Sequence, residues 1–211
     1  MICIKKYICL LCALLLFLAA CGKEDVYKNI PDPVVTMTMD DGSVMRFELL
    51  LAKAPNTVAN FVSLVQSGFY DGLEFYRVVP GLLIQSGDPV GDGTGGADYT
   101  IKGEFSANGV PNTVKHERGV ISMARRSDYN SASSQFFIMV QSCEEYNGRY
   151  AAFGRAMDNE TLETIDRIAS ANIDSQYRPV RSYRIQSVTV ETFGYEYIPV
   201  TIESEEEDEE D

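Results

Sequence analysis

The sequence predicts a mainly β protein: a closed, eight-stranded antiparallel β-barrel capped by two α-helices. Only two segments show the apolar period of an amphipathic helix, and they lie far apart in the chain. Nearly all other apolar residues fall in short runs between Gly-rich or polar turns, which indicates short strands. Because strands and helices do not alternate, we expect a barrel with a helix at each open end rather than a parallel sheet.

The first regular element is expected to be a β-hairpin. Residues 34–39 alternate apolar residues with threonine, and a second apolar run covers residues 44–51. Asp41 and Gly42 lie between the two runs, and this dipeptide is typical of a tight hairpin turn. The segment before the hairpin, residues 21–33, is expected to be a linker.

Two amphipathic helices are predicted, over residues 55–67 and 159–169. The apolar face of the first consists of Val58, Phe61, Val62 and Val65. Pro55 suits its first turn, and a glycine directly after the segment suits its end. The apolar face of the second consists of Leu162, Ile165, Ile168 and Ala169. Asp158 or Asn159 suits its N-cap. The remaining strands are expected near residues 74–79, 82–86, 119–124, 135–140, 152–157 and 183–193.

The N-terminal segment is expected to direct export. Lys5 and Lys6 precede an apolar run over residues 7–20, which is too short and wrongly flanked for a stable transmembrane helix. Small residues and then Cys21 follow this run, an arrangement that resembles a bacterial lipoprotein signal. The resemblance implies a signal peptide of residues 1–20, lipidation of Cys21, and anchoring to a bacterial membrane at the periplasmic face or the cell surface. The alternative is an ordinary secretory signal in which Cys21 is incidental.

Composition limits the functions open to the rest of the chain. The formal charge is −13 and no basic patch offsets it, so nucleic-acid binding is disfavoured. Beyond the N-terminal segment the only cysteine is Cys143, and the only histidine is His116. Neither an internal disulfide nor a metal cluster is therefore expected. No cofactor is expected, and a monomer is the default.

The C-terminal segment carries much of the negative charge. Eight of the nine residues from 203 to 211 are acidic. The folded domain is expected to cover residues 34–193, followed by an extension over residues 194–211. Like charges at this density repel one another and stay solvated, which predicts a disordered acidic tail. A specific partner for the tail is the alternative.

Two motifs have simpler explanations than the chemistry they suggest. Gly91, Gly93 and Gly96 satisfy the spacing of a dinucleotide-binding loop, but no helix is expected to begin there, and nearby aspartates would repel phosphate. A flexible surface loop is the expected structure. A Ser-His-Asp triad would need His116, but no serine lies on a nucleophile elbow.

The run from Phe75 to Asp88 places two polar residues within apolar strands. Arg77 lies in the first strand and Gln85 in the second. If both side chains point to the same side, they place a fixed charge and an amide beside an apolar patch. Taken alone, each residue favours a simpler arrangement, with Arg77 at a barrel rim and Gln85 facing solvent.

Three further blocks change this interpretation. Residues 119–124 read GVISMA, residues 131–140 read SASSQFFIMV, and residues 146–154 read YNGRYAAFG. Together with FYRVVPG at residues 75–81, and in this order and spacing, they resemble the cyclophilin family over residues 34–193. The resemblance implies a cyclophilin-like fold and a peptidyl-prolyl cis–trans isomerase that acts on X–Pro bonds. With the export signal, it implies that the substrates are exported or envelope proteins, including unfolded chains.

The resemblance also implies roles for matched positions. Arg77 matches the family's catalytic arginine, and Gln85 and Gln135 match glutamines that orient the substrate backbone. Arg77 and Gln85 are the predicted catalytic pair. The positions that match the lining of the proline pocket are Leu82, Leu83, Phe137 and Tyr146. The other positions that match the substrate-binding surface are Gly93, Ala124, Arg125, Glu145 and Tyr150.

Two departures from the family pattern bear on the substrate pocket. Leu82 stands where the family usually has phenylalanine, and Glu145 stands where many members have an aromatic residue. Because of these two departures, a binding function without catalysis is the alternative to an isomerase. In that alternative, the groove binds proline-containing segments or unfolded chains as a chaperone, with little or no isomerase turnover.

Overall fold

The computed structural model describes residue 27 and residues 29–203. It divides into two units, residues 1–31 and 32–211. In the first unit, the amide of Ile30 donates to the carbonyl of Tyr27 at 3.0 Å. The predicted signal peptide, Cys21 and the acidic residues 204–211 lie outside the described residues. Among the described residues, no helix has both the length and the apolar character needed to cross a membrane.

Eight strands of the second unit form one antiparallel sheet, in the order β3-β4-β7-β6-β8-β2-β1-β9. The strands of this sheet are β1 (Val34–Met39), β2 (Val44–Leu49), β3 (Arg77–Val79), β4 (Leu83–Ser86), β6 (Val120–Met123), β7 (Phe136–Met139), β8 (Ala152–Ala156) and β9 (Ile185–Glu191). The mainly β fold and its eight strands are therefore confirmed. The extension also contributes a strand that the sequence does not predict, because β10 (Ile202–Glu203) pairs with β5 (Tyr99–Thr100) in a separate two-stranded sheet.

The sheet curls, but its closure is less regular than the predicted barrel. The edge strands β3 and β9 do not pair with each other in the described ladder. Instead, the amide of Phe75 donates to the carbonyl of Tyr183 at 2.9 Å, and the amide of Ile185 donates to the carbonyl of Leu73 at 2.8 Å. The irregular segments before β3 and β9 thus join the two edges, and a fully closed barrel overstates the pairing.

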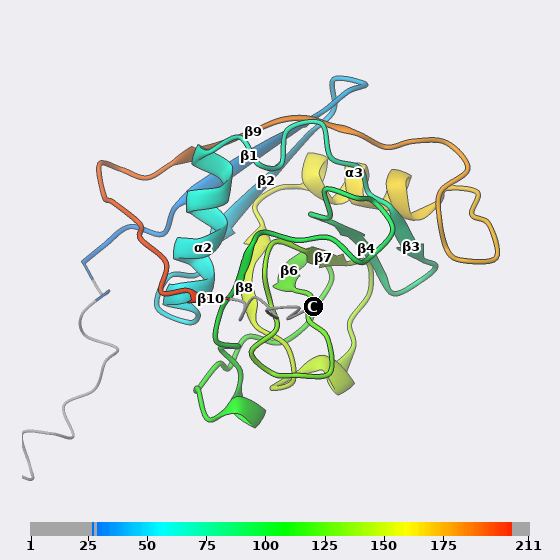
Figure 1. The fold of residues 1–211 in the computed structure, drawn as a ribbon. Helices are drawn as coiled ribbons and strands as arrows, with labels where there is room; N and C mark the ends of the chain where they lie inside the picture. Colours follow the sequence, from blue (N-terminus) through cyan, green and yellow to red (C-terminus); the bar gives the residue numbers. More distant parts are fainter. Residues whose placement is uncertain (1–26, 28, 204–211) are drawn as a thin grey trace, which may run out of the picture. The chain divides into compact units, whose positions relative to one another are not determined.

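Two helices cover different parts of the curled sheet (Figure 1). They are α2 (Pro55–Gln66) and α3 (Asn159–Ala169), and both predicted segments are confirmed to within one residue. α2 contacts β9, whereas α3 contacts β2 and β4. α2 ends at Gln66, and Gly68 follows with a φ of 72°, a left-handed conformation that glycine adopts without strain.

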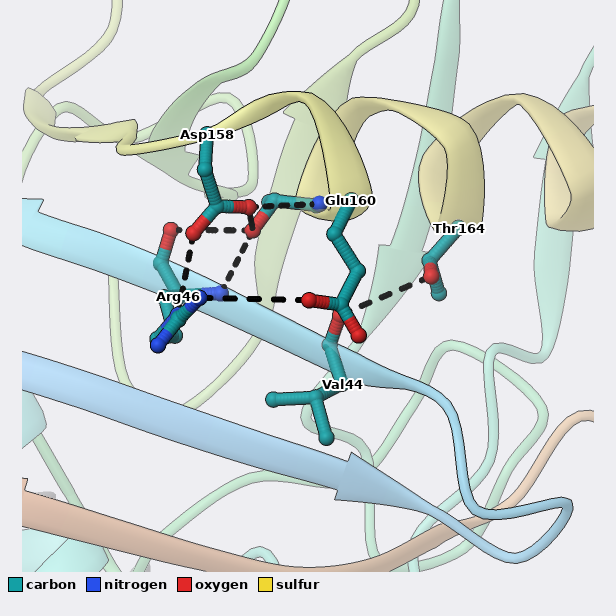
Figure 2. Close-up of polar contacts among 6 residues, drawn as sticks. Val44, Arg46, Asp158, Glu160 and Thr164 are labelled. Carbon is teal, nitrogen blue, oxygen red and sulfur yellow. Dashed lines mark hydrogen bonds and ion pairs between the residues drawn. The ribbon is translucent and has the colours of Figure 1, made fainter.

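The N-terminus of α3 is tied to β2 by a polar network (Figure 2). Asp158 is the N-cap, because its side chain accepts a hydrogen bond from the amide of Thr161 at 2.8 Å. Its other carboxylate oxygen accepts from Arg46 Nε at 2.9 Å, and Glu160 lies 3.9 Å from the same guanidinium. Hydrogen bonds from Thr161, followed by the contact with Arg46, hold the pKa of Asp158 below its usual value.

The N-terminus of α2 is capped by a residue from another part of the chain. The N-cap residue, Ala54, makes no side-chain cap. Instead, the buried carboxylate of Glu104 accepts from the amides of Asn56 at 3.1 Å and Thr57 at 2.7 Å, and from the Thr57 hydroxyl at 2.7 Å. A carboxylate here satisfies free amides of the first helical turn and complements the helix dipole.

Replacing Glu104 by alanine is therefore expected to lower the free energy of unfolding by about 2–4 kcal/mol, since buried amides lose their acceptor. Urea denaturation of the parent and of Glu104→Ala measures the loss. The matched control is Glu117→Ala, which removes an exposed glutamate and should change stability by less than about 0.5 kcal/mol. Equal losses in the two variants would show that Glu104 does not cap α2.

Candidate active site

Arg77 and Gln85 face each other across a strand pair. They are paired residues of the β3–β4 ladder, so their side chains point to the same side of the sheet. Arg77 Nη1 donates to Gln85 Oε1 at 2.9 Å. Gln85 is only 8% exposed, whereas Arg77 is half-buried. The alternative in which Gln85 faces solvent is thus excluded, and the amide fixes the guanidinium.

The side-chain amide of Gln85 is hydrogen-bonded to a second side-chain amide, that of Gln135. Gln85 Nε2 donates to Gln135 Oε1 at 2.9 Å, and the hydroxyl of Tyr76 donates to the same oxygen at 2.5 Å. Gln135 Nε2 in turn donates to the carbonyls of Gly93 at 3.1 Å and Gly95 at 2.8 Å. A continuous row of hydrogen bonds therefore runs from the strand pair to the loop, and each amide has a defined orientation.

Tyr76 belongs to this row but is not among the site residues expected from the sequence. Burial, followed by the nearby Asp88 carboxylate, raises the pKa of Tyr76 well above its usual value. The phenol therefore stays protonated and remains a donor to Gln135. No sequence signal distinguishes this tyrosine from an ordinary apolar strand residue.

The glycine-rich loop folds around a carboxylate of its own chain. Asp88 accepts from the amides of Val90 at 2.8 Å, Asp92 at 3.1 Å and Gly93 at 2.5 Å. A Cβ on Gly95 would lie 2.2 Å from Asp88 Oδ1, so only glycine fits there. The loop amides face an internal carboxylate rather than a phosphate, as expected for a surface loop and not for a dinucleotide site.

An aromatic cluster lies beside the polar row. Phe137 on β7 is the ladder partner of Gln85. Its ring meets Tyr146 at a centroid distance of 5.7 Å and Tyr150 at 5.5 Å, both edge to face. Leu83 is a buried member of the same apolar cluster, against which the partly buried Leu82, Ala124, Tyr146 and Tyr150 pack. The structure thus brings the predicted proline-pocket residues together.

Glu145 and Arg125 are two further predicted substrate-binding residues. Glu145 is exposed in the short 3-10 helix η3 (Glu144–Tyr146), directly before Tyr146 of the aromatic cluster. The guanidinium of Arg125 lies 4.7 Å from the ring centroid of Tyr129 and 4.8 Å from that of Tyr150. It also donates to the carbonyl of Arg149 at 2.9 Å. The side chain of Arg125 is therefore committed to contacts within the protein.

A cavity of about 680 Å³ opens along the polar row. The predicted site residues that line it are Arg77, Gln85, Gly93, Ala124, Arg125 and Gln135. The rest of its wall comes largely from residues 92–100. In the part of the chain that the structure describes, no group of three or more His, Cys, Asp or Glu side chains is arranged to hold a metal ion.

His116 packs against the aromatic cluster. Its Nε2 lies 3.0 Å from the Ser122 hydroxyl and its Nδ1 lies 3.3 Å from Asn147 Oδ1, while its ring stacks on Phe137 at 6.0 Å. The Ser-His-Asn order is that of a nucleophilic relay. Ser122 is completely buried, however, and cannot meet a substrate. His116 therefore supports the aromatic wall.

The burial of His116 has a consequence for stability. Burial lowers the pKa of His116 below its usual value of about 6.5, although the hydrogen bond with Asn147 opposes the shift. The folded state thus favours the neutral ring, so this contribution to stability is complete above the unfolded-state pKa of about 6.5 and is lost as pH falls toward the lower folded-state pKa.

We expect the free energy of unfolding to fall more steeply below pH 6.5 in the parent than in His116→Gln, because glutamine does not titrate. Urea denaturation at half-unit steps from pH 7.5 to pH 5 measures both slopes. Carboxylates titrate in both proteins, so the difference between the slopes isolates the histidine. Parallel slopes would contradict the assignment of a buried, neutral ring.

Comparisons with known proteins agree with this geometry. Residues 34–190 match the family model described as cyclophilin type peptidyl-prolyl cis-trans isomerase/CLD. The chain is 41% identical to peptidyl-prolyl cis-trans isomerase B of Bacillus subtilis, over 66% of this chain and 93% of that protein. It is 42% identical to the peptidyl-prolyl cis-trans isomerase of Synechococcus elongatus, over 61% of this chain and 88% of that protein.

A solved structure supports the same class. The cyclophilin type peptidyl-prolyl cis-trans isomerase of Cryptosporidium parvum, crystallised in the presence of the dipeptide Ala-Pro, matches with a TM-score of 0.66 and 32% identity. The match covers 75% of this chain and 98% of that one. Fold and comparisons together define an enzyme that isomerises peptidyl-prolyl bonds. The chain belongs to the cyclophilin family of peptidyl-prolyl cis–trans isomerases.

Proposed function

We propose that this isomerase acts on X–Pro bonds of exported or envelope proteins and assists their folding, with Arg77 and Gln85 as the catalytic pair. One observation carries the catalytic assignment. The Arg77 guanidinium is held by Gln85 and forms no ion pair with a carboxylate among residues 29–203. Its charge and its remaining N–H donors are therefore available to a bound peptide.

The chemistry requires no nucleophile and no metal. Amide conjugation gives rotation about the peptide bond a barrier of roughly 18–20 kcal/mol. In the twisted transition state the proline nitrogen regains its lone pair and becomes a hydrogen-bond acceptor. Arg77 can donate to that nitrogen only in this state, so the interaction stabilises the transition state more than the ground state.

The two halves of the site suit the two parts of the substrate. The apolar pocket takes the proline ring, and its lining residues are Leu82, Leu83, Phe137, Tyr146 and Tyr150. The cavity takes the flanking peptide, with Gln135 orienting its backbone beside Gly93 and Ala124. Holding the ring while the flanking peptide turns, in a partly dried groove, adds to the effect of Arg77. The Cryptosporidium parvum relative, crystallised in the presence of the dipeptide Ala-Pro, supports a proline-containing substrate.

Exchange between the cis and trans forms of a short Ala-Pro peptide, followed by NMR, tests the catalytic proposal. The parent should accelerate exchange, and Arg77→Ala should lose most of the acceleration. Equal acceleration by the two proteins would remove Arg77 from the mechanism.

The location of the enzyme is proposed from the N-terminal sequence alone. Acyl chains on Cys21 would anchor the mature protein to the membrane. We expect the full chain, expressed in bacteria, to fractionate with membranes, and Cys21→Ser to fractionate with soluble protein. Cys143→Ser is the matched control, because it removes a cysteine of the folded body and should leave the protein in the membrane fraction. If the parent is soluble too, the N-terminal segment is an ordinary secretory signal.

A further inference from the structure

The cavity beside the polar row is rich in arginine. Four arginines line it: Arg77, Arg125, Arg126 and Arg178. Among residues 29–203, none of the four forms an ion pair, whereas every ion pair found there involves an arginine outside the cavity. Asp92 and Asp98 also line the cavity, so its lining side chains are net positive. This local excess stands out in a chain whose formal charge is −13.

Three of the four arginines are held in place by uncharged partners, and for Arg77 this partner is Gln85. Arg126 Nη2 donates to the carbonyl of Thr94 at 3.2 Å, and both residues line the cavity. Arg125 is fixed between aromatic rings. Asp92, one of the two aspartates that line the cavity, accepts from the amide and the hydroxyl of Thr94. The positive charges are thus positioned in advance for a negatively charged occupant.

The C-terminal extension leads to this cavity. The side chain of Asn56 forms two hydrogen bonds with the backbone of Val200. It donates to the carbonyl at 3.0 Å and accepts from the amide at 2.7 Å. β10 then pairs with β5, whose two residues both line the cavity. In Figure 1 the red end of the ribbon lies beside α2 at β10. The last described residues are therefore fixed at the cavity wall.

The register of this strand pair sets the direction in which the chain leaves β10. Ile202 lies opposite Thr100, and Glu203 lies opposite Tyr99. Because the strands are antiparallel, a chain that continued β10 would next pass residues 98, 97 and 96, all of which line the cavity. At about 3.3 Å per residue, eight extended residues reach roughly 26 Å. That length exceeds the roughly 10 Å that three extended residues such as 96–98 span.

We propose that residues 204–211, with the sequence SEEEDEED, bind in the arginine-lined cavity and compete there with the substrate. Seven of these eight residues are acidic, which matches the charge of the cavity. Attachment through β10 makes the binding intramolecular, so a weak electrostatic interaction acts at an effective concentration of the order of millimolar. The effect on activity rests on the proposed isomerase function, whereas the binding itself does not.

Binding is tested first without reference to activity. NMR spectra of the full chain are compared with those of a chain that stops after Glu203, and with a full-length variant in which the seven acidic residues of 204–211 become Gln or Asn. At low salt, the amide signals of residues 93–100 should differ between the full chain and both variants. At about 1 M salt, where the Debye length is about 3 Å, the differences should vanish. Identical spectra at low salt would overturn the proposal.

A pair of arginine variants locates the binding site. Arg178→Ala removes a cavity charge, and Arg181→Ala removes an exposed arginine outside the cavity lining. The spectral change caused by truncation should shrink in Arg178→Ala and persist in Arg181→Ala. Equal changes in the two variants would place the acidic segment elsewhere and overturn the proposal.

Measuring isomerase activity of the full and truncated chains distinguishes a failure of this inference from a failure of the proposed function. Truncation should raise kcat/KM for a proline peptide carrying glutamates by about threefold to tenfold at low salt, and by nothing at high salt. If neither chain isomerises the peptide but the spectra differ as expected, the inference stands and the proposed function fails. If both chains isomerise it equally and the spectra are identical, the inference is overturned while the proposed function stands.

Discussion

Replacing Arg77 by alanine is expected to lower kcat/KM for a proline peptide by about 10- to 150-fold, which corresponds to the loss of one charged hydrogen bond of about 1.5–3 kcal/mol in the transition state. The loss should fall mainly on kcat, because the proline nitrogen becomes an acceptor only when the bond is twisted. Exchange spectroscopy of an Ala-Pro peptide over a range of substrate concentrations separates kcat from KM.

Two controls make the Arg77 result specific. Arg181→Ala removes an exposed arginine outside the cavity lining and should leave the rate unchanged. The unfolding midpoint of Arg77→Ala in urea should lie close to that of the parent, because the side chain is half-buried and forms no ion pair within the described residues. A rise in KM with kcat unchanged would assign Arg77 to substrate binding alone, whereas a loss of kcat/KM below threefold would contradict the catalytic assignment.

Replacing Phe61 by alanine is expected to lower the free energy of unfolding by about 3–5 kcal/mol, the usual cost of removing a buried phenylalanine. Phe61 is completely buried on α2. Its ring lies 4.9 Å from Tyr70, 5.4 Å from Phe136 on β7 and 5.1 Å from Phe153 on β8. One side chain thus joins the helix to two central strands, and its loss leaves a cavity that rigid β-structure cannot close.

Urea denaturation of Phe61→Ala measures this loss. Phe193→Ala is the matched control, because Phe193 is 49% exposed and its removal should cost less than about 0.5 kcal/mol. A cost below about 1 kcal/mol for Phe61→Ala would mean that the helix is not anchored through this ring.

The two helices can be predicted from the sequence to within a residue because their signals are local. α2 has a clear apolar period, a proline at its start and a glycine after its end. The strands agree less closely at their ends, because short apolar runs have no comparable stop signals. β7, for example, covers Phe136–Met139 within a predicted span of 135–140. Resemblance to a family adds what periodicity lacks, namely which strands lie side by side.

Long-range contacts are what the sequence does not reveal. The cap that Glu104 provides for α2, the joining of the two sheet edges, and the pairing of β10 with β5 all connect segments far apart in the chain. The same holds for Tyr76 and for the packing of Arg125 between aromatic rings. The predicted site residues lie together on the strands and loops that carry them, whereas their catalytic and binding roles stay predictions.

The most direct test compares turnover with binding in one preparation of the full chain. The first measurement is the rate of cis–trans exchange of an Ala-Pro peptide. The second is the ability of the same preparation to suppress aggregation of an unfolded protein. We predict that the full chain accelerates exchange well above the uncatalysed rate, which has a time constant of roughly tens to hundreds of seconds. Suppression of aggregation without any acceleration of exchange would contradict the isomerase assignment, because the groove would then be a binding module and not an active site.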